Sequence, residues 1–268
     1  MGVEENTKET SRWMYDSTGL ADDQFTTLYE RLKAAVRDRL KQHATHVKIP
    51  VVLGIAGALE VTLKYLRRNR VQAELAESHS VSQSTISRAI TVVTDLLADC
   101  LAEERPRLEQ LPKDTALLID GTLLPCWAWK THDGLFSGKH HHSGVNIQVI
   151  TDTHGNLQWI SPILHGSVHD VKAFDTHEIL GHLNPRNIIA DKGYIGRGLH
   201  TPVRTQPGRK LTESEEDYNQ RINHIRWPIE RAIAHLKTWR ILSTIYRRPY
   251  PSFQTTVNAI TGIIFGIL

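Results

Sequence analysis

The chain has 268 residues, 40% of them hydrophobic and 23% charged, and its formal net charge of +3 is too small to indicate nucleic acid by itself. Its two cysteines, Cys100 and Cys126, lie far apart, which excludes a disulfide framework and a cysteine-based zinc motif. The polar N-terminus is not a signal peptide and no apolar run reaches the ~18 residues of a membrane span, so we expect a cytoplasmic protein with no membrane partner.

The first hundred residues predict helices. Residues 22–42 have apolar side chains at helical spacing and a basic opposite face, which we interpret as a solvated surface, and residues 51–65 predict a second, apolar helix. Residues 71–97 then predict a helix-turn-helix, with a tight turn at His79–Ser80 and a second helix capped by Ser82. Two short helices with an apolar seam also occur in proteins that do not bind DNA, so this pattern alone leaves both interpretations open.

If the helix-turn-helix binds DNA, its second helix faces the major groove and the basic segment before it contacts phosphates. The predicted groove-facing residues are Gln83, Ser84, Thr85, Ser87 and Arg88, and the predicted phosphate contacts are Arg67, Arg68 and Arg70.

Residues 103–114 contain two prolines and seven charges, which predicts a linker. We therefore expect a helical domain over residues 1–102 and a second domain over residues 115–268.

The second domain alternates predicted elements. Two apolar runs, at 116–119 and 187–190, lead into Asp120 and Asp191 with a glycine close behind, so we expect buried strands that stop at these carboxylates. Residues 145–152 and 157–164 predict a hairpin, and 170–180 a helix. Asp170 is either the N-cap of that helix or a group beside a metal, and we favour the cap.

The polar loop predicted over residues 130–144 contains His140–His142. Three consecutive side chains cannot all point at one ion, and no cysteine or acidic partner lies at ligand spacing. We therefore favour a DNA-facing loop over a zinc site.

The apolar residues of 222–239 recur every three or four positions, which predicts a helix with one buried face. Glu230 lies at the edge of that face, on nearly the same line as Arg226 and Lys237. Pro228 predicts a kink or a restart at Trp227–Pro228. Residues 212–215 form a capping box that opens the final helices, and 255–268 predict a closing helix.

Two aspartates at strand ends and a glutamate on a later helix can bring three carboxylates together. Hard divalent cations prefer oxygen ligands, and a pair of them can activate water and stabilise the leaving oxygen of a phosphodiester. A lone glutamate among basic residues is usually part of a solvated surface, but the two aspartates favour the metal interpretation.

The order Asp120, Asp191, Glu230, with Arg226 and Lys237 around the glutamate, resembles the DDE transposases of the insertion-sequence IS5 group, related to Harbinger-type DDE endonucleases. The C-terminal signature of that group has a tyrosine where this chain has Asn223. Five further motifs also look like landmarks of the family and follow its order: Asp120-Gly-Thr122, Gly138-Lys-His140, Gly144–Val149, Gly166–Asp170 and Asp191–Tyr194.

This resemblance implies a helical helix-turn-helix domain followed by an RNase H-like DDE catalytic domain, a mixed sheet flanked by helices. It implies that Asp120, Asp191 and Glu230 are catalytic and hold two Mg²⁺ (or Mn²⁺) ions. It further implies that Lys139, Arg226 and Lys237 contact DNA.

The function that follows is Mg²⁺-dependent transposition. The protein would bind the terminal inverted repeats of its element in double-stranded DNA, cut there and join the ends to target DNA, acting in the nucleoid and as a homo-oligomer on the paired ends. The alternatives are a catalytically inactive or domesticated helix-turn-helix protein and a non-transposing RNase H-like nuclease.

Overall fold

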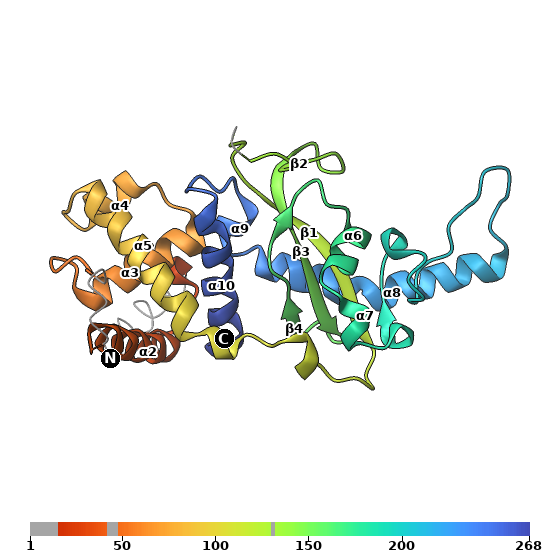
Figure 1. Cartoon of the computed structure of the whole chain (residues 1–268), viewed down its shortest axis with the longest axis horizontal. Coiled ribbons are helices and arrows are strands. Elements are labelled where there is room, and N and C mark those ends of the chain that lie inside the picture. Colours follow the sequence, from red (N-terminus) through yellow and green to blue (C-terminus); the bar gives the residue numbers. More distant parts are fainter. Residues whose placement is uncertain (1–15, 42–47, 130–131) are drawn as a thin grey trace, which may run out of the picture. The chain divides into compact units, whose positions relative to one another are not determined.

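The computed structural model describes residues 16–41, 48–129 and 132–268, which form two compact units (Figure 1). Unit 1 contains the described residues up to Arg105, together with Thr238–Thr244 and Arg248–Leu268. Unit 2 contains Pro106–Lys237 and Ile245–Arg247. The first ten residues, Gln42 and positions 130–131 of the predicted polar loop lie outside the described residues.

Unit 1 is helical and is built around one long helix, α5. Its helices are α2 (Asp22–Lys41), α3 (Gly54–Arg68), α4 (Gln72–Ser78), α5 (Gln83–Cys100), α9 (Arg240–Ser243) and α10 (Pro251–Gly266). Helix α5 packs against α2, α3, α4 and α10. The helices predicted near residues 22–42 and 51–65 and the closing helix are therefore confirmed.

The helix-turn-helix consists of α4 and α5. Ser80 occupies the turn with a φ of 52°, and Ser82 caps α5 by accepting a hydrogen bond from the Thr85 N–H at 3.2 Å. Leu75, Ile86 and Ile90 are buried in the seam. Both the turn and the cap are at the positions that the sequence predicted.

The prediction that residues 103–114 are a linker between two domains stays a prediction. Two features of the packing in this part of the chain bear on it. Helix α10 packs mainly on α5 and the 3-10 turn Ala102–Glu104, because its buried face, which includes Phe253, Val257 and Ile260, is strongly apolar. Leu108 and Leu111, in the predicted linker, are buried in the core of unit 2.

Unit 2 contains a mixed six-stranded sheet. Its strands are β1 (Leu117–Pro125), β2 (Phe136–Ser137), β3 (His142–Asp152), β4 (Leu157–Ile160), β5 (Leu164–His165) and β6 (Ile188–Ile189). The order is β2-β3-β1-β6, and β4 and β5 also pair with β3. The long central pair β1–β3 is antiparallel, whereas β1 and β6 are parallel.

Helices cover both faces of this sheet. Helix α8 (Glu213–Leu236) contributes Ile222 and Ile229 to a cluster with Leu118 and Ile189. Helix α6 (Asp170–Thr176) and helix α7 (Ile179–His182) pack in a second cluster that contains Ile119. Since residues alternate between the faces of a strand, Asp120 lies on the α8 face of β1 and Gly121 on the α6 face. The predicted fold class, a helical region followed by a mixed sheet flanked by helices, is confirmed.

Two local predictions were wrong. Strand β1 does not stop at Asp120 but runs on to Pro125, because every residue from Leu117 to Pro125 pairs with β3. Of the kink or restart predicted at Trp227–Pro228, the restart is wrong, because helix α8 is continuous through Pro228, and the kink stays a prediction. Arg226 and Glu230 therefore keep their helical spacing, and Lys237 follows directly as the C-cap residue.

Two other predictions need adjustment. The helix predicted over 170–180 is interrupted at Glu178, which has a φ of 52°. The strand predicted to stop at Asp191 ends earlier, at Ile189 of β6, and Asp191 caps the 3-10 turn Lys192–Tyr194 that follows. Among the described residues, no helix combines the length and apolar character that crossing a membrane requires.

Candidate active site and DNA-binding surface

Asp120 is a largely buried carboxylate on the central strand. Its Oδ1 accepts the Gly121 N–H at 2.9 Å, and its Oδ2 lies 3.2 Å from Nη2 of Arg226. Burial raises the pKa of Asp120 to about 6; Arg226 opposes this shift, and the neighbouring Asp191 and Asp170 carboxylates add to it. The desolvation of the Asp120 carboxylate is therefore the main cause of its raised pKa, and its attraction to Arg226 does not cancel it.

Asp191 reaches the same region from the neighbouring strand. Leu118 of β1 pairs in parallel with Ile189 of β6, and each aspartate lies two residues beyond its paired residue. The Asp191 Oδ1 accepts the Gly193 N–H at 2.7 Å, which fixes the carboxylate at the strand end. The structure thus places the two predicted aspartates close enough for Asp191 to raise the pKa of Asp120.

Helix α8 supplies two basic side chains to this region. Arg226 is buried against Asp120. Lys237 is partly buried, and burial lowers its pKa while Asp120 opposes the shift. Glu230 lies between them in the sequence, directly after the buried Ile229, but its side chain is exposed and forms no hydrogen bond or ion pair within the described part of the chain.

Asp170 is a further carboxylate near this region, and it is buried; the sequence offered it as a helix cap or as a group beside a metal. The N-cap of α6 is His169, and Asp170 is the first helical residue, so the favoured cap interpretation was wrong. The carboxylate instead accepts hydrogen bonds from Lys139 Nζ at 2.7 Å and from Asn146 Nδ2 at 2.9 Å. One fact in the sequence pointed to it: its motif, Gly166–Asp170, is among the five.

The chemistry of these side chains fits a hard divalent cation. Carboxylate oxygens are the ligands that Mg²⁺ and Mn²⁺ prefer, and Asp191 and Asp170 lie near enough to Asp120 to add to the rise in its pKa that burial causes. In the conformation described, however, no three His, Cys, Asp or Glu side chains among residues 16–41, 48–129 and 132–268 are grouped closely enough to hold a metal ion. A complete site would need a further carboxylate to turn inward.

The second helix of the helix-turn-helix presents a polar outer surface. Gln83, Ser84 and Arg88 are exposed, and Ser87 is half-buried. The Gln83 side chain donates a hydrogen bond to Gln72 of α4 at 2.9 Å, which braces the two helices. Contact of these four residues with bases stays a prediction.

Thr85 differs from its neighbours. It is 8% exposed, and its hydroxyl lies 2.9 Å from that of Ser82 at the helix cap. Since it points into the seam, we leave it out of the proposed set of base-reading residues.

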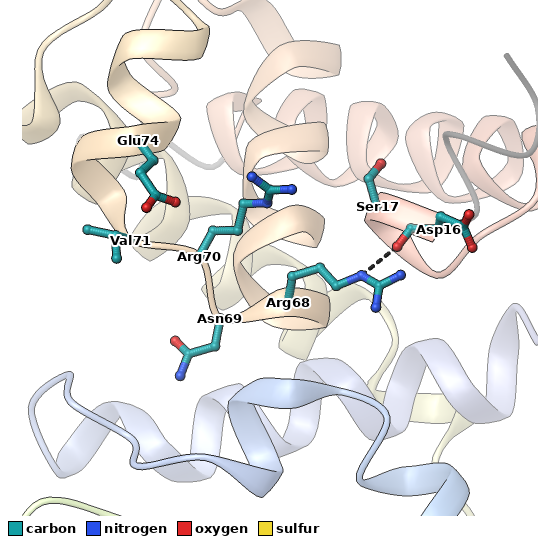
Figure 2. Close-up of a pocket in the computed structure, with 7 residues that line it drawn as sticks. All are labelled: Asp16, Ser17, Arg68, Asn69, Arg70, Val71 and Glu74. Atoms are coloured by element: carbon teal, nitrogen blue, oxygen red, sulfur yellow. Dashed lines mark hydrogen bonds between the residues drawn. The ribbon is translucent and has the colours of Figure 1, made fainter.

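The three arginines of the basic segment before α4 also differ in their exposure and contacts. Arg67 donates a hydrogen bond to Thr238 at 2.6 Å and lies over the Trp239 ring, 5.5 Å from its centroid. Arg68 and Arg70 are exposed and line a hollow of ≈530 Å³ (Figure 2). Arg68 donates to the backbone carbonyl of Asp16, as Figure 2 shows. The other residues that line the hollow are Asp16, Ser17, Asn69, Val71 and Glu74.

Comparisons with known proteins match both the helix-turn-helix part and the sheet-containing part of the chain. Residues 119–267 match the family model described as DDE superfamily endonuclease, and residues 53–103 match the helix-turn-helix of DDE superfamily endonuclease. A protein of Streptomyces albus G, named as a transposase for insertion sequence element IS112, is 29% identical over 86% of this chain and 85% of its own length. A protein of Microchaete diplosiphon, named as a transposase for insertion sequence element IS702, is 25% identical over 98% of this chain and 97% of its own length. No solved structure matches the chain.

Proposed function

The chain belongs to the DDE superfamily endonucleases, and we propose that it cuts the terminal repeats of its own insertion sequence and joins the freed ends to target DNA. The enzyme is an insertion-sequence transposase of this superfamily, since two relatives with that name align with it over most of their length. The observation that supports the proposed chemistry best is the proximity of Asp120, within β1, and Asp191, just beyond β6, beside Arg226 and Lys237.

In the proposed site, Asp120, Asp191 and Glu230 hold two Mg²⁺ or Mn²⁺ ions. When bound, such a pair activates the attacking oxygen and stabilises the leaving oxygen of a phosphodiester. Glu230 is an exposed residue at the edge of the α8 face, on the same side of the helix as Arg226 and Lys237, so a change of side-chain rotamer is the smallest movement that could turn it toward Asp120.

The basic side chains have separate roles in this proposal. Arg226 is buried, and we assign it to balancing the charge of Asp120 rather than to DNA. Lys237 is partly exposed and can reach a phosphate of the bound strand. Such contacts supply affinity and position, while sequence is read from base edges.

The helix-turn-helix supplies that recognition. Gln83, Ser84, Ser87 and Arg88 lie on the outer side of α5, where the second helix of such a motif enters the major groove. Arg68 and Arg70 then contact the phosphates that flank the bound site. We also propose that the protein is a homo-oligomer when two ends are paired, because joining needs both ends in one complex.

The test uses a duplex with the terminal repeat of the element and a target duplex. We expect Asp120→Asn, Asp191→Asn and Glu230→Gln each to reduce Mg²⁺-dependent cutting and joining by at least about a thousandfold, with end binding unchanged within about twofold. Glu216→Gln is the matched control, because Glu216 is an exposed acid on the same helix. A variant of any of the three that joined ends at the wild-type rate would remove that residue from the site.

The wild-type protein separates the other hypotheses in the same assay. Binding of the repeat without cutting would favour an inactive or domesticated DNA-binding protein. Cutting without joining, and without preference for the repeat, would favour a nuclease on the same fold.

A further inference from the structure

A line of polar side chains crosses the interior of unit 2 on the α6 face of the sheet. The Tyr194 hydroxyl donates to Gln148 Oε1 at 2.6 Å, and Gln148 Nε2 donates to Asn146 Oδ1 at 3.0 Å. Asn146 Nδ2 donates to Asp170 Oδ1 at 2.9 Å. Lys139 Nζ donates to the other carboxylate oxygen, Oδ2, at 2.7 Å. One continuous set of hydrogen bonds therefore connects Tyr194 to Lys139.

This line is buried along nearly all of its length. Tyr194 and Gln148 are 0% exposed, Asn146 is 6% exposed and Asp170 is 8% exposed. Buried polar groups destabilise a protein unless each finds its partner, and networks of them hold their members in fixed positions when all are satisfied. The Asp170 carboxylate is thus held in one orientation by Asn146, which itself accepts a hydrogen bond from Gln148.

Gly121 of strand β1 leaves room for the Asp170 carboxylate because it has no side chain. A Cβ at Gly121 would lie 2.1 Å from Asp170 Oδ1 and 2.8 Å from Gln148 Nε2, distances that no side chain can occupy. Gly121 has an ordinary φ, so its role is to allow close approach rather than to form a turn. Asp170 therefore packs directly on the strand that carries Asp120.

Lys139 is the exposed end of the line. Its side chain is 53% exposed, so the ammonium is accessible from solvent while it is bound to Asp170. Burial lowers the pKa of Lys139, but the hydrogen bond and charge of Asp170, with smaller contributions from Asp191 and Asp120, outweigh that effect and raise it. Lys139 is thus a fixed positive charge within the field of all three aspartates.

We propose that Asp170 is a positioning residue, which holds the Lys139 ammonium beside Asp120 and Asp191 so that Lys139 contacts a phosphate of the strand being cut. This inference rests on the proposed function. The five motifs supply the members of this arrangement in turn: Gly121, Lys139, the pair Asn146 and Gln148, Asp170, and Tyr194.

The geometry distinguishes this role from that of a metal ligand. Both oxygens of Asp170 already accept hydrogen bonds, and one of them is bound by an ammonium group that repels a cation. Asp170 therefore acts through Lys139, and its removal has the same consequence as removal of Lys139.

A double-mutant cycle in the full-length protein tests this equivalence. Asp170→Asn, Lys139→Met and the double variant are compared in single-turnover cutting of the terminal-repeat duplex, over a range of DNA and Mg²⁺ concentrations. We expect each single variant to lower the saturated cutting rate at least about tenfold, and the double variant to be no slower than the slower single variant within about twofold. The half-saturating DNA concentration stays within about twofold, because the helix-turn-helix supplies most of the affinity.

Other variants guard against a merely structural effect. Lys139→Arg keeps the charge and is expected to cut within about threefold of the wild-type rate. Asn146→Ala removes the amide that orients Asp170 and is expected to reproduce the loss, again without adding to Lys139→Met. If Asp170→Asn fails to fold by circular dichroism, the cycle between Asn146→Ala and Lys139→Met takes its place.

Two results would overturn the inference. Losses that multiply in the double variant would show that Asp170 and Lys139 act independently. A rise of about tenfold or more in the half-saturating Mg²⁺ concentration for Asp170→Asn, but not for Lys139→Met, would show that Asp170 binds the metal directly. Asp120→Asn in the same assay distinguishes failure of the proposed function from failure of this inference. If Asp120→Asn cuts normally, the proposed function fails. If it is inactive while the losses in the double-mutant cycle are additive, only the inference about Asp170 fails.

Discussion

Arg226 and Asp120 form a buried ion pair between helix α8 and strand β1, with Nη2 3.2 Å from Oδ2 and side chains that are only 9% and 18% exposed. Despite this partner, burial raises the pKa of Asp120 to about 6. The cost of burying the carboxylate therefore exceeds what Arg226 returns. A site that needs a metal ion is expected to be unfavourable in this way without it.

The pair gives a prediction about stability and pH. The pKa of the Asp120 carboxyl is higher in the folded protein, at about 6, than the ordinary value of 3.8. The folded protein therefore loses stability as pH rises from 3.8 to about 6. Asp120→Asn removes this loss, so at pH 7.5 in EDTA we expect it to raise the free energy of unfolding by on the order of 2–3 kcal/mol. Thermal unfolding followed by circular dichroism measures the change.

Two comparisons sharpen that experiment. Below pH 3.8 the wild-type carboxyl is protonated in both states, so the advantage of Asp120→Asn should disappear. Arg226→Met should have the opposite sign at pH 7.5, because it leaves the carboxylate without its charge partner. An Asp120→Asn protein that unfolds at or below the wild-type temperature at pH 7.5 would contradict the account.

Gly121 gives a prediction about shape. Gly121→Ala places a methyl group 2.1 Å from Asp170 Oδ1, so the carboxylate has to move. We expect a loss of about 1–3 kcal/mol in stability, as for other overpacked sites, and a loss of cutting with end binding retained. Gly138→Ala is the matched control, since a Cβ there meets nothing within 4 Å. Equal behaviour of the two variants in melting and cutting assays would show that Asp170 has room to shift.

These residues also show what the sequence could and could not predict. Helical periodicity, the Ser82 cap and the capping box at 212–215 are local patterns, and they correctly located α8, the helix-turn-helix and the start of the final helices. The pairing of β1 with β3 beyond Asp120 depends on contacts distant in sequence, so a glycine after an aspartate looked like a strand end. The role of Gly121 becomes visible only when Asp170 is seen above it.

The direction in which a side chain points was the second property that the sequence did not predict. Asp170 has the composition of a helix cap, yet its partners Lys139 and Asn146 come from other parts of the chain. Thr85 lies among exposed polar residues in sequence but on the inner side of α5 in space. The predicted roles of Asp120, Asp191 and Glu230 remain predictions until the variants are assayed.

Thr85 and Arg88 provide a test of the helix-turn-helix. Arg88→Ala removes an exposed cation from the predicted base-reading surface, and we expect end binding to weaken by about tenfold or more. Thr85→Val keeps the shape of a buried side chain but loses the hydroxyl contact with Ser82, so it should lower stability and leave DNA affinity within about twofold. Arg37→Ala, a change of one charge on the exposed side of α2, is the control. Gel-shift titration of the repeat duplex and thermal melting together decide the outcome, and a large loss of affinity in Thr85→Val would return Thr85 to the recognition surface.

The three arginines near α4 are expected to separate by their dependence on salt. Each phosphate that a protein neutralises adds about 0.9 to the slope of binding against salt concentration on a logarithmic scale. Arg68→Ala and Arg70→Ala each remove an exposed guanidinium beside the hollow of Figure 2, so each should lower that slope by about 1. Arg67 is held by Thr238 and lies over Trp239, so Arg67→Ala should leave the slope unchanged and lower the melting temperature of the protein instead. Binding titrations between 50 and 200 mM salt (a range of about fourfold) measure the slope. A reduced slope for Arg67→Ala, with unchanged melting, would mean that Arg67 leaves Trp239 and contacts DNA in the complex.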